Sequence, residues 1–310
     1  MSVLEELQEA AAAAGAAVGP ATVRIGRDGG RGLGLVTAPG VVVTNAHNLR
    51  GRQVTVTFAD GRSATGDVRA VDADGDVAVV AVKTGTAPPV RWSDRVASIG
   101  MPVWTVTLAA AGSTRVTAGA VSAVGRPFHG PGGRLIAASV EHTAPLARGS
   151  SGGALVDAAG AVVGLNTHRL GDGFYLALPA DADLQARIDR LAGGQSPVRR
   201  RLGVALAPAP AARRLRAAVG LPERDGLLVR GVEDAGPAAV AGIRTGDLIV
   251  EVAGRPIATP DDLFAALESD DDRLPVVVAR GGDEVTVVVD FAPADASTSG
   301  DGGGEGSPPS

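Results

Sequence analysis

The sequence predicts a mostly β protein of two units, an antiparallel barrel or sandwich followed by a smaller domain. A length of 310 residues corresponds to about two domains at roughly 100–200 residues each. Hydrophobic residues make up 45% of the chain, which is enough for sizeable cores, but aromatic residues make up only 3%. The cores must therefore be built from Val, Ala, Leu and Ile. Short valine-rich runs separated by glycine turns indicate strands rather than long helices.

Residues 1–20 are predicted to form an N-terminal helix. Ser2 is followed three residues later by Glu5, a spacing typical of a capping box, and the alanine run at 10–14 favours a helix. That run is too short to span a bilayer, and no other stretch approaches 18 apolar residues without a charge. The acidic start is unlike a secretory signal. We expect a cytoplasmic chain; a periplasmic or extracellular location would need a leader ahead of this sequence.

The first domain is expected at residues 21–191. Leu184, Ile188 and Leu191 recur at i, i+4 and i+7, which predicts a closing helix over residues 181–191. Turn signals at residues 59–61 and 74–75 separate the strands. The clearest predicted strands are residues 41–43, 54–58, 77–82 and 162–165.

The second domain is expected at residues 201–292, after a linker at residues 192–200. Thr259 is a suitable N-cap, Pro260 suits the first helical turn, and two aspartates follow at the positive end of the helix dipole. Residues 293–310 are rich in Gly, Pro and Ser, so this tail is expected to be disordered. The predicted strands of this domain are residues 226–232, 248–252, 275–279 and 284–291.

The composition excludes several kinds of chemistry. The chain has no cysteine, so it has no disulfide, thiolate nucleophile, iron–sulfur cluster or cysteine-ligated zinc. Its net charge of −5 provides no global basic field for nucleic acid or for an anionic membrane. We therefore expect neither as a partner.

Residues 149–153 (GSSGG) are the strongest candidate for a nucleophile loop. A nucleophilic serine needs backbone N–H groups that converge on the oxyanion, and glycines permit the tight turn that this requires. We expect Ser151 to be the nucleophile. The alternative is a flexible Ser/Gly loop. The expected oxyanion hole comprises Gly149, Ser150 and Ser151, with the N–H groups of Gly149 and Ser151 as donors.

A nucleophilic serine also needs a base, and the chain has four histidines. His47 lies at the end of a β run, where an imidazole can be held rigidly as a general base. His142, near the nucleophile loop, is a second candidate, whereas His129 lies in a Gly/Pro loop and is expected to be solvated. Asp76 opens an apolar strand and could hold the imidazole in the required tautomer. The alternative for Asp76 is a simple turn residue at the start of a strand.

Three blocks in this order resemble the active-site blocks of HtrA/Deg (DegP-like) serine proteases: residues 44–47 (TNAH), 76–79 (DVAV) and 149–155 (GSSGGAL). The resemblance implies a chymotrypsin-like double β-barrel. It also implies His47 as base, Asp76 as its orienting carboxylate and Ser151 as nucleophile of an acyl-enzyme mechanism. Such a mechanism needs no metal and no cofactor. Residues 32–34, 116–119 and 164–167 also match blocks of the family, and residues 173–179 match loosely.

The same resemblance implies a pocket for the substrate side chain that precedes the cleaved bond. Its walls would include Leu146, Asn166, Thr167, His168 and Arg169. Relatives generally have apolar walls here and prefer small aliphatic side chains. His168 and Arg169 would make part of the wall polar and basic, which predicts a shift toward polar or acidic residues. The alternative is that both side chains turn out to solvent.

Residues 201–204 (RLGV) and 235–249 resemble a PDZ domain of the HtrA type. Such a domain binds a peptide C-terminus as an added strand at an open sheet edge. The resemblance implies that the N–H groups of Leu202, Gly203 and Val204 receive the carboxylate. The helix carrying Leu263 and Leu267 would form the other wall. The alternative is a PDZ domain that only packs against the protease and regulates it.

Together these features predict a serine endopeptidase that cuts unfolded or damaged proteins in protein quality control. Its partners would be protein or peptide substrates and, through the PDZ domain, peptide C-termini. Relatives generally assemble as trimers, so the resemblance also implies a homo-oligomer. Two alternatives remain open: a catalytically silent scaffold that uses the PDZ domain alone, and a narrow regulatory protease with one signalling substrate.

Overall fold

The computed structural model describes residues 2–27, 31–108, 113–130, 133–197, 200–207, 209–221, 223–269 and 271–291. The chain divides into two compact units, Met1–Pro197 and Val198–Ser310. The tail at residues 293–310, expected to be disordered, lies outside the described residues. Within the described part of the chain, no helix is both long and apolar enough to cross a membrane.

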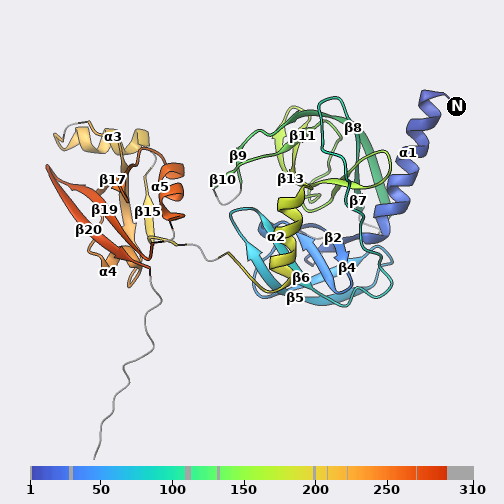
Figure 1. The fold of residues 1–310 in the computed structure, drawn as a ribbon, viewed down its shortest axis with the longest axis horizontal. Helices are drawn as coiled ribbons and strands as arrows, with labels where there is room; N and C mark the ends of the chain where they lie inside the picture. Colours follow the sequence, from blue (N-terminus) through green and yellow to red (C-terminus); the bar gives the residue numbers. More distant parts are fainter. Residues whose placement is uncertain are drawn as a thin grey trace, which may run out of the picture. The chain divides into compact units, whose positions relative to one another are not determined.

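The first half of unit 1 is a closed barrel with the strand order β1-β2-β3-β6-β5-β4 (Figure 1). Its central strands β3 and β6 are valine-rich and pair antiparallel from Val41↔Ala81 to Thr44↔Ala78. Most of their side chains are buried, as expected for continuous apolar runs. The strands are β1 (Thr22–Ile25), β2 (Gly32–Ala38), β3 (Val41–Thr44), β4 (Gln53–Phe58), β5 (Ser63–Asp72) and β6 (Val77–Ala81).

The second half of unit 1 is another closed six-stranded barrel, with the order β11-β14-β13-β12-β7-β8. A small hairpin of β9 (Phe128–His129) and β10 (Leu135–Ile136) precedes β11. Two antiparallel barrels in one unit confirm the predicted double-barrel fold. The strands are β7 (Pro102–Leu108), β8 (Thr114–Val124), β11 (Val140–His142), β12 (Ala154–Val156), β13 (Val162–Gly171) and β14 (Phe174–Pro179).

Two helices pack on the outside of these barrels (Figure 1). Helix α1 (Val3–Val18) starts with the expected capping box between Ser2 and Glu5, is followed by the short helix η1 (Gly19–Ala21), and contacts β7 and β8. Helix α2 (Ala182–Ala192) has Asp181 as its N-cap and contacts β5 and β6. The apolar spacing predicted α2 correctly, because Leu184, Ile188 and Leu191 are its buried residues.

Unit 2 is a twisted sheet with the order β15-β16-β17-β19-β20, in which β18 pairs with β17. Strand β15 therefore lies at an edge. Helix α5 begins at the predicted place, with Thr259 as N-cap and Asp262 completing a capping box. The elements are β15 (Val204–Leu206), α3 (Ala209–Ala218), β16 (Leu227–Val232), α4 (Pro237–Val240), β17 (Leu248–Val252), β18 (Arg255–Pro256), α5 (Pro260–Leu267), β19 (Arg273–Arg280) and β20 (Asp283–Asp290).

An ion pair between the buried Asp247 and the half-buried Arg280 stabilises the start of β17. Asp247 is 2% exposed and accepts hydrogen bonds from Arg280 Nε at 2.8 Å and Arg280 Nη2 at 2.7 Å. The backbone N–H of Arg244 donates a third bond at 2.8 Å. Burial raises the pKa of Asp247, but these bonds and the two positive charges outweigh it, so the pKa lies below its ordinary value.

Candidate active site

The three predicted triad residues come from three separate segments of unit 1. His47 lies on the short helix η2 (Ala46–Asn48) directly after β3, Asp76 lies just before β6, and Ser151 lies in the turn before β12. The Ser151 loop is bound to the first barrel through its carbonyl oxygen. That oxygen accepts the Leu33 N–H at 2.7 Å and Asn48 Nδ2 at 3.0 Å. The serine of the second barrel is thus fixed beside the histidine helix of the first.

His47 and Asp76 form a close pair. His47 Nδ1 is 2.9 Å from both carboxylate oxygens of Asp76, and the His47 backbone N–H donates to Asp76 Oδ1 at 3.1 Å. Asp76 is 1% exposed and has a left-handed backbone with φ of 53°, fixed by a 3.0 Å hydrogen bond from Asn45 Nδ2 to its carbonyl oxygen. A proton on Nδ1, facing the carboxylate, leaves Nε2 as the basic nitrogen.

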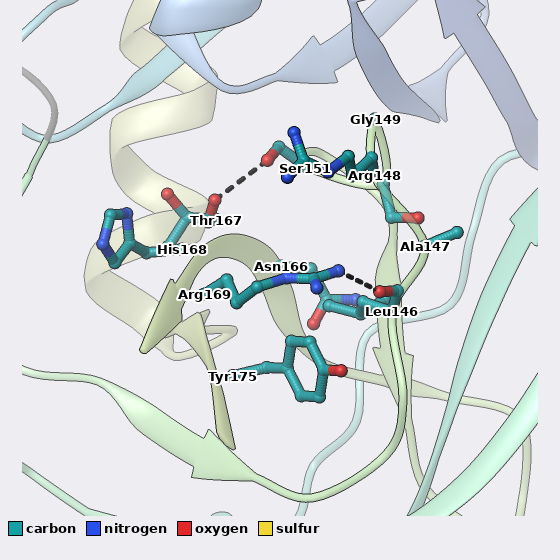
Figure 2. A pocket seen from close by; sticks show the side chains of 11 residues that line it. Leu146, Ala147, Arg148, Gly149, Ser151, Asn166, Thr167, His168, Arg169 and Tyr175 are labelled. Atoms are coloured by element: carbon teal, nitrogen blue, oxygen red, sulfur yellow. Dashed lines mark hydrogen bonds between the residues drawn. The ribbon is translucent and has the colours of Figure 1, made fainter. Parts of the chain in front are cut away.

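Thr167 contacts both the carboxylate and the serine. Its hydroxyl donates to Asp76 Oδ2 at 2.6 Å, and its carbonyl oxygen accepts the Ser151 hydroxyl at 2.9 Å (Figure 2). Among the described residues, no hydrogen bond joins Ser151 to His47. The hydroxyl must therefore leave the Thr167 carbonyl before His47 can accept its proton. The sequence assigned Thr167 only to the pocket; its contact with Asp76 is a finding of the structure.

The loop around Ser151 leaves backbone donors free. Gly149 and Gly152 have φ of 79° and 87°, the left-handed region that favours glycine. A Cβ on Gly152 would lie 2.0 Å from the Leu33 carbonyl oxygen, so only glycine fits there. Within the described chain, the N–H groups of Gly149 and Ser151 have no hydrogen-bond acceptor. These are the two groups that the sequence analysis expected to bind an oxyanion.

A small cavity of about 90 Å³ lies beside Ser151 (Figure 2). The guanidinium of Arg169 extends across it, donating through Nη2 to the Leu146 carbonyl oxygen and lying 5.3 Å from the Tyr175 ring centroid. The His168 ring points away from the cavity and stacks on Phe128 at 6.4 Å. Arg169 therefore contributes its charge to the cavity and His168 does not. All five predicted pocket residues line the cavity, as do the nucleophile-loop residues Gly149, Ser150 and Ser151. The other lining residues were not predicted at the site: Ala147, Arg148 and Tyr175.

His142 lies behind this cavity. It is fully buried, its Nε2 is 2.9 Å from Asn166 Oδ1, and its ring lies 5.7 Å from that of Tyr175. Burial lowers the pKa of His142 to about 4, although the Asn166 contact and the charge of Glu141 act in the opposite direction. His142 is therefore neutral near pH 7 and contacts the pocket amide. It is not bonded to Asp76 or Ser151 within the described residues, which leaves His47 as the candidate base.

The predicted peptide groove of unit 2 lies at the β15 edge. Gly203 has φ of 74°, and its carbonyl accepts the Glu233 N–H at 2.8 Å, while the Leu202 carbonyl accepts the Ala238 N–H at 2.9 Å. Within the described chain, the N–H groups of Leu202 and Gly203 have no acceptor. Three predicted groove side chains lie in the buried core of the unit: Leu202, Leu263 and Leu267.

No group of three or more His, Asp or Glu side chains in the described part of the chain is arranged to hold a metal ion.

Comparison with known proteins agrees with this architecture. Residues 32–165 match the family model of a trypsin-like peptidase domain, and residues 228–280 match that of a PDZ domain. The protein HhoA of Synechocystis sp. is 33% identical over 255 residues, which cover 77% of this chain and 64% of HhoA. Serine protease HTRA4 of Mus musculus is 29% identical over 276 residues, covering 82% of this chain and 55% of HTRA4.

Solved structures give the same result. The serine endoprotease from Yersinia pestis superposes with a TM-score of 0.62 at 25% identity, covering 90% of this chain and 96% of that one. The chain belongs to the HtrA family of serine proteases, with a trypsin-like peptidase domain followed by a PDZ domain. It spans 64% of the length of HhoA and about half of that of HTRA4.

Proposed function

We propose that this chain is a serine endopeptidase that hydrolyses peptide bonds in unfolded or damaged proteins. One observation carries the proposal. The buried Asp76 orients the imidazole of His47 at 2.9 Å, while Ser151 lies in a glycine-supported turn beside two free backbone N–H groups. The family match to a trypsin-like peptidase domain supports the same activity. A fold alone would need none of these polar groups in this arrangement.

The proposed reaction uses each group in turn. The Ser151 hydroxyl rotates from the Thr167 carbonyl to His47 Nε2, which takes its proton as Ser151 Oγ attacks the substrate carbonyl carbon. The N–H groups of Gly149 and Ser151 stabilise the resulting oxyanion. His47 then gives its proton to the leaving amine as the C–N bond breaks, leaving an ester on Ser151. Water hydrolyses that ester with His47 again acting as base.

The PDZ unit is proposed to bind peptide C-termini and to regulate cleavage. Strand β15 is the edge of its sheet, so an extended peptide can pair with it. The free N–H groups of Leu202 and Gly203 lie directly before this strand, where a terminal carboxylate would be received. Assembly into a homo-oligomer and a cytoplasmic location remain predictions from the sequence.

Digestion of casein by the wild type and by Ser151→Ala tests the proposal. Loss of the nucleophile should reduce the rate at least about 10³-fold. Ser63→Ala is a matched control, because Ser63 is an exposed strand serine whose hydroxyl, within the described chain, bonds to that of Thr57 at 2.9 Å. Equal digestion by the wild type and Ser151→Ala would leave only the scaffold interpretation. Cleavage of one folded partner without cleavage of casein would favour the narrow regulatory protease.

A further inference from the structure

The cavity beside Ser151 presents hydrogen-bond donors and positive charge without a carboxylate. No Asp or Glu is among its lining residues, whereas both Arg148 and Arg169 are. A cavity of this kind suits an occupant that only accepts hydrogen bonds and carries negative charge. Among amino-acid side chains, ionised Asp and Glu fit that description.

The Arg169 guanidinium is held in place with donors to spare. It donates through Nη2 to the Leu146 carbonyl oxygen and lies over the Tyr175 ring at 5.3 Å. A guanidinium has five N–H donors in a rigid fork, so this one contact leaves others available to a carboxylate. Because Leu146 and Tyr175 already fix the side chain, little conformational entropy is lost when a ligand binds.

A second donor lies deeper in the cavity wall. Asn166 is fully buried, and its Nδ2 has no hydrogen-bond partner in the described chain. His142 Nε2 lies 2.9 Å from Asn166 Oδ1, so the amide oxygen is the atom in contact with the neutral imidazole. The amide NH₂ group is left unpaired, and a buried unpaired donor is costly until an acceptor reaches it.

From these contacts we propose that the cavity selects an acidic residue, Glu or Asp, immediately before the cleaved bond, with Arg169 as the specificity-determining residue. The proposal rests on the endopeptidase function proposed above. Two basic residues follow Thr167, and the proposal assigns the charge of the cavity wall to Arg169. The His168 ring points away from the cavity and stacks on Phe128 (Figure 2).

The test compares peptides that differ only at the residue before the cleaved bond: Glu, Gln, Asp, Asn, Ala and Val. Each peptide carries a C-terminal amide, so that the PDZ unit is offered no free carboxylate. Glu and Gln have nearly the same shape, so their ratio of kcat/KM isolates the charge. We expect the wild-type chain to favour Glu over Gln at least about tenfold, the range of one charge-assisted hydrogen bond.

Variants then assign the preference to one side chain. Arg169→Ala should reduce the Glu/Gln ratio to about one to three, and Arg169→Lys should give an intermediate ratio. Arg91→Ala is the matched control. Arg91 is also exposed and also donates to a backbone carbonyl, that of Ala159 at 2.7 Å, but it lies outside the cavity lining. Its ratio should equal that of the wild type.

Three results would overturn the proposal: a wild-type preference for Ala or Val, an unchanged Glu/Gln ratio in Arg169→Ala, or a ratio lost only in Arg148→Ala. Failure of the enzyme function itself would look different, because Ser151→Ala would then match the wild type on every peptide. In that case the Kd of Ser151→Ala for the same amidated peptides still measures the cavity. Equal Kd values for the Glu and Gln peptides would refute the acidic preference without any chemistry.

Discussion

Replacing Thr167 by valine removes one hydroxyl from the site and leaves its shape almost unchanged. That hydroxyl donates to Asp76 Oδ2 at 2.6 Å, and Asp76 is 1% exposed, so water cannot readily replace the bond. A hydrogen bond to a charged group contributes about 1.5–3 kcal/mol. If the whole amount supports the Asp76–His47 pair in the transition state, kcat/KM should fall about 10- to 150-fold.

The assay is the rate of peptide cleavage by full-length Thr167→Val, together with its free energy of unfolding. The Thr167 carbonyl oxygen remains in the variant, so the acceptor of the Ser151 hydroxyl is retained. We therefore expect the loss mainly in kcat, with KM changed less than about threefold. Thr167→Ser keeps a hydroxyl at the same place and should recover most of the rate.

Thr37→Val is the matched control. The Thr37 hydroxyl is buried and has no hydrogen-bond partner among the described residues, so its removal should leave kcat within about twofold of the wild type. A Thr167→Val enzyme with wild-type kcat would refute the argument that this hydroxyl supports the pair. An equal loss in Thr167→Val and Thr37→Val would show that barrel packing, and not the bond to Asp76, was responsible.

Two further predictions concern a backbone constraint and an ion pair. Gly152→Ala would place a Cβ 2.0 Å from the Leu33 carbonyl oxygen at a left-handed φ. We expect active-site titration to show that activity is lost, and denaturation to show that the free energy of unfolding falls by about 1–3 kcal/mol. Gly61→Ala is the control and should retain activity, because Gly61 is equally left-handed but has open space around it. Asp247→Asn should destabilise unit 2 by about 2 kcal/mol. This loss is smaller than that expected on breaking a fully buried ion pair, because the Arg280 side chain is 32% exposed. The pKa of Asp247 is lowered on folding, so the ionised carboxylate stabilises unit 2. This stabilisation is complete above pH 3.8, the ordinary pKa of the group, and is lost as the pH falls below that value. Hydrogen exchange of residues 248–252 should show wild-type protection falling in acid more steeply than that of the variant; parallel curves would contradict the assignment.

The sequence predicted the strongly patterned elements and missed those whose pattern is weak. Residues 41–43 and 77–82 are continuous apolar runs, and they form β3 and β6 at the centre of the first barrel. Helix α3 was not predicted, because its proline and arginines gave no clear apolar spacing. The long pair β7 and β8 lies in the region predicted to be strand-rich but was not singled out, since threonine and arginine interrupt the alternation of β8.

The same division holds within the site. Serine between glycines, histidine after a strand and aspartate before a strand are chemical types that a sequence displays directly. A sequence does not show the directions in which neighbouring side chains point. Residues that follow each other in a strand face opposite sides, whereas the sequence analysis expected His168 and Arg169 either both in the wall or both in solvent. The pairing register of β13 shifts between Asn166 and His168 and between Arg169 and Gly171. Counting alternate residues along the strand therefore cannot tell which of the two side chains faces the cavity.

The Thr167 main chain also decides how ready the site is to react. Its carbonyl oxygen holds the Ser151 hydroxyl at 2.9 Å, in competition with His47 Nε2. Both are hydrogen bonds of a neutral hydroxyl, each with a net contribution of about 1 kcal/mol, so exchanging one for the other changes the free energy little. A substrate carbonyl bound to the free N–H groups of Gly149 and Ser151 gains its full interaction only when Ser151 Oγ attacks it. Substrate binding therefore favours the rotated hydroxyl.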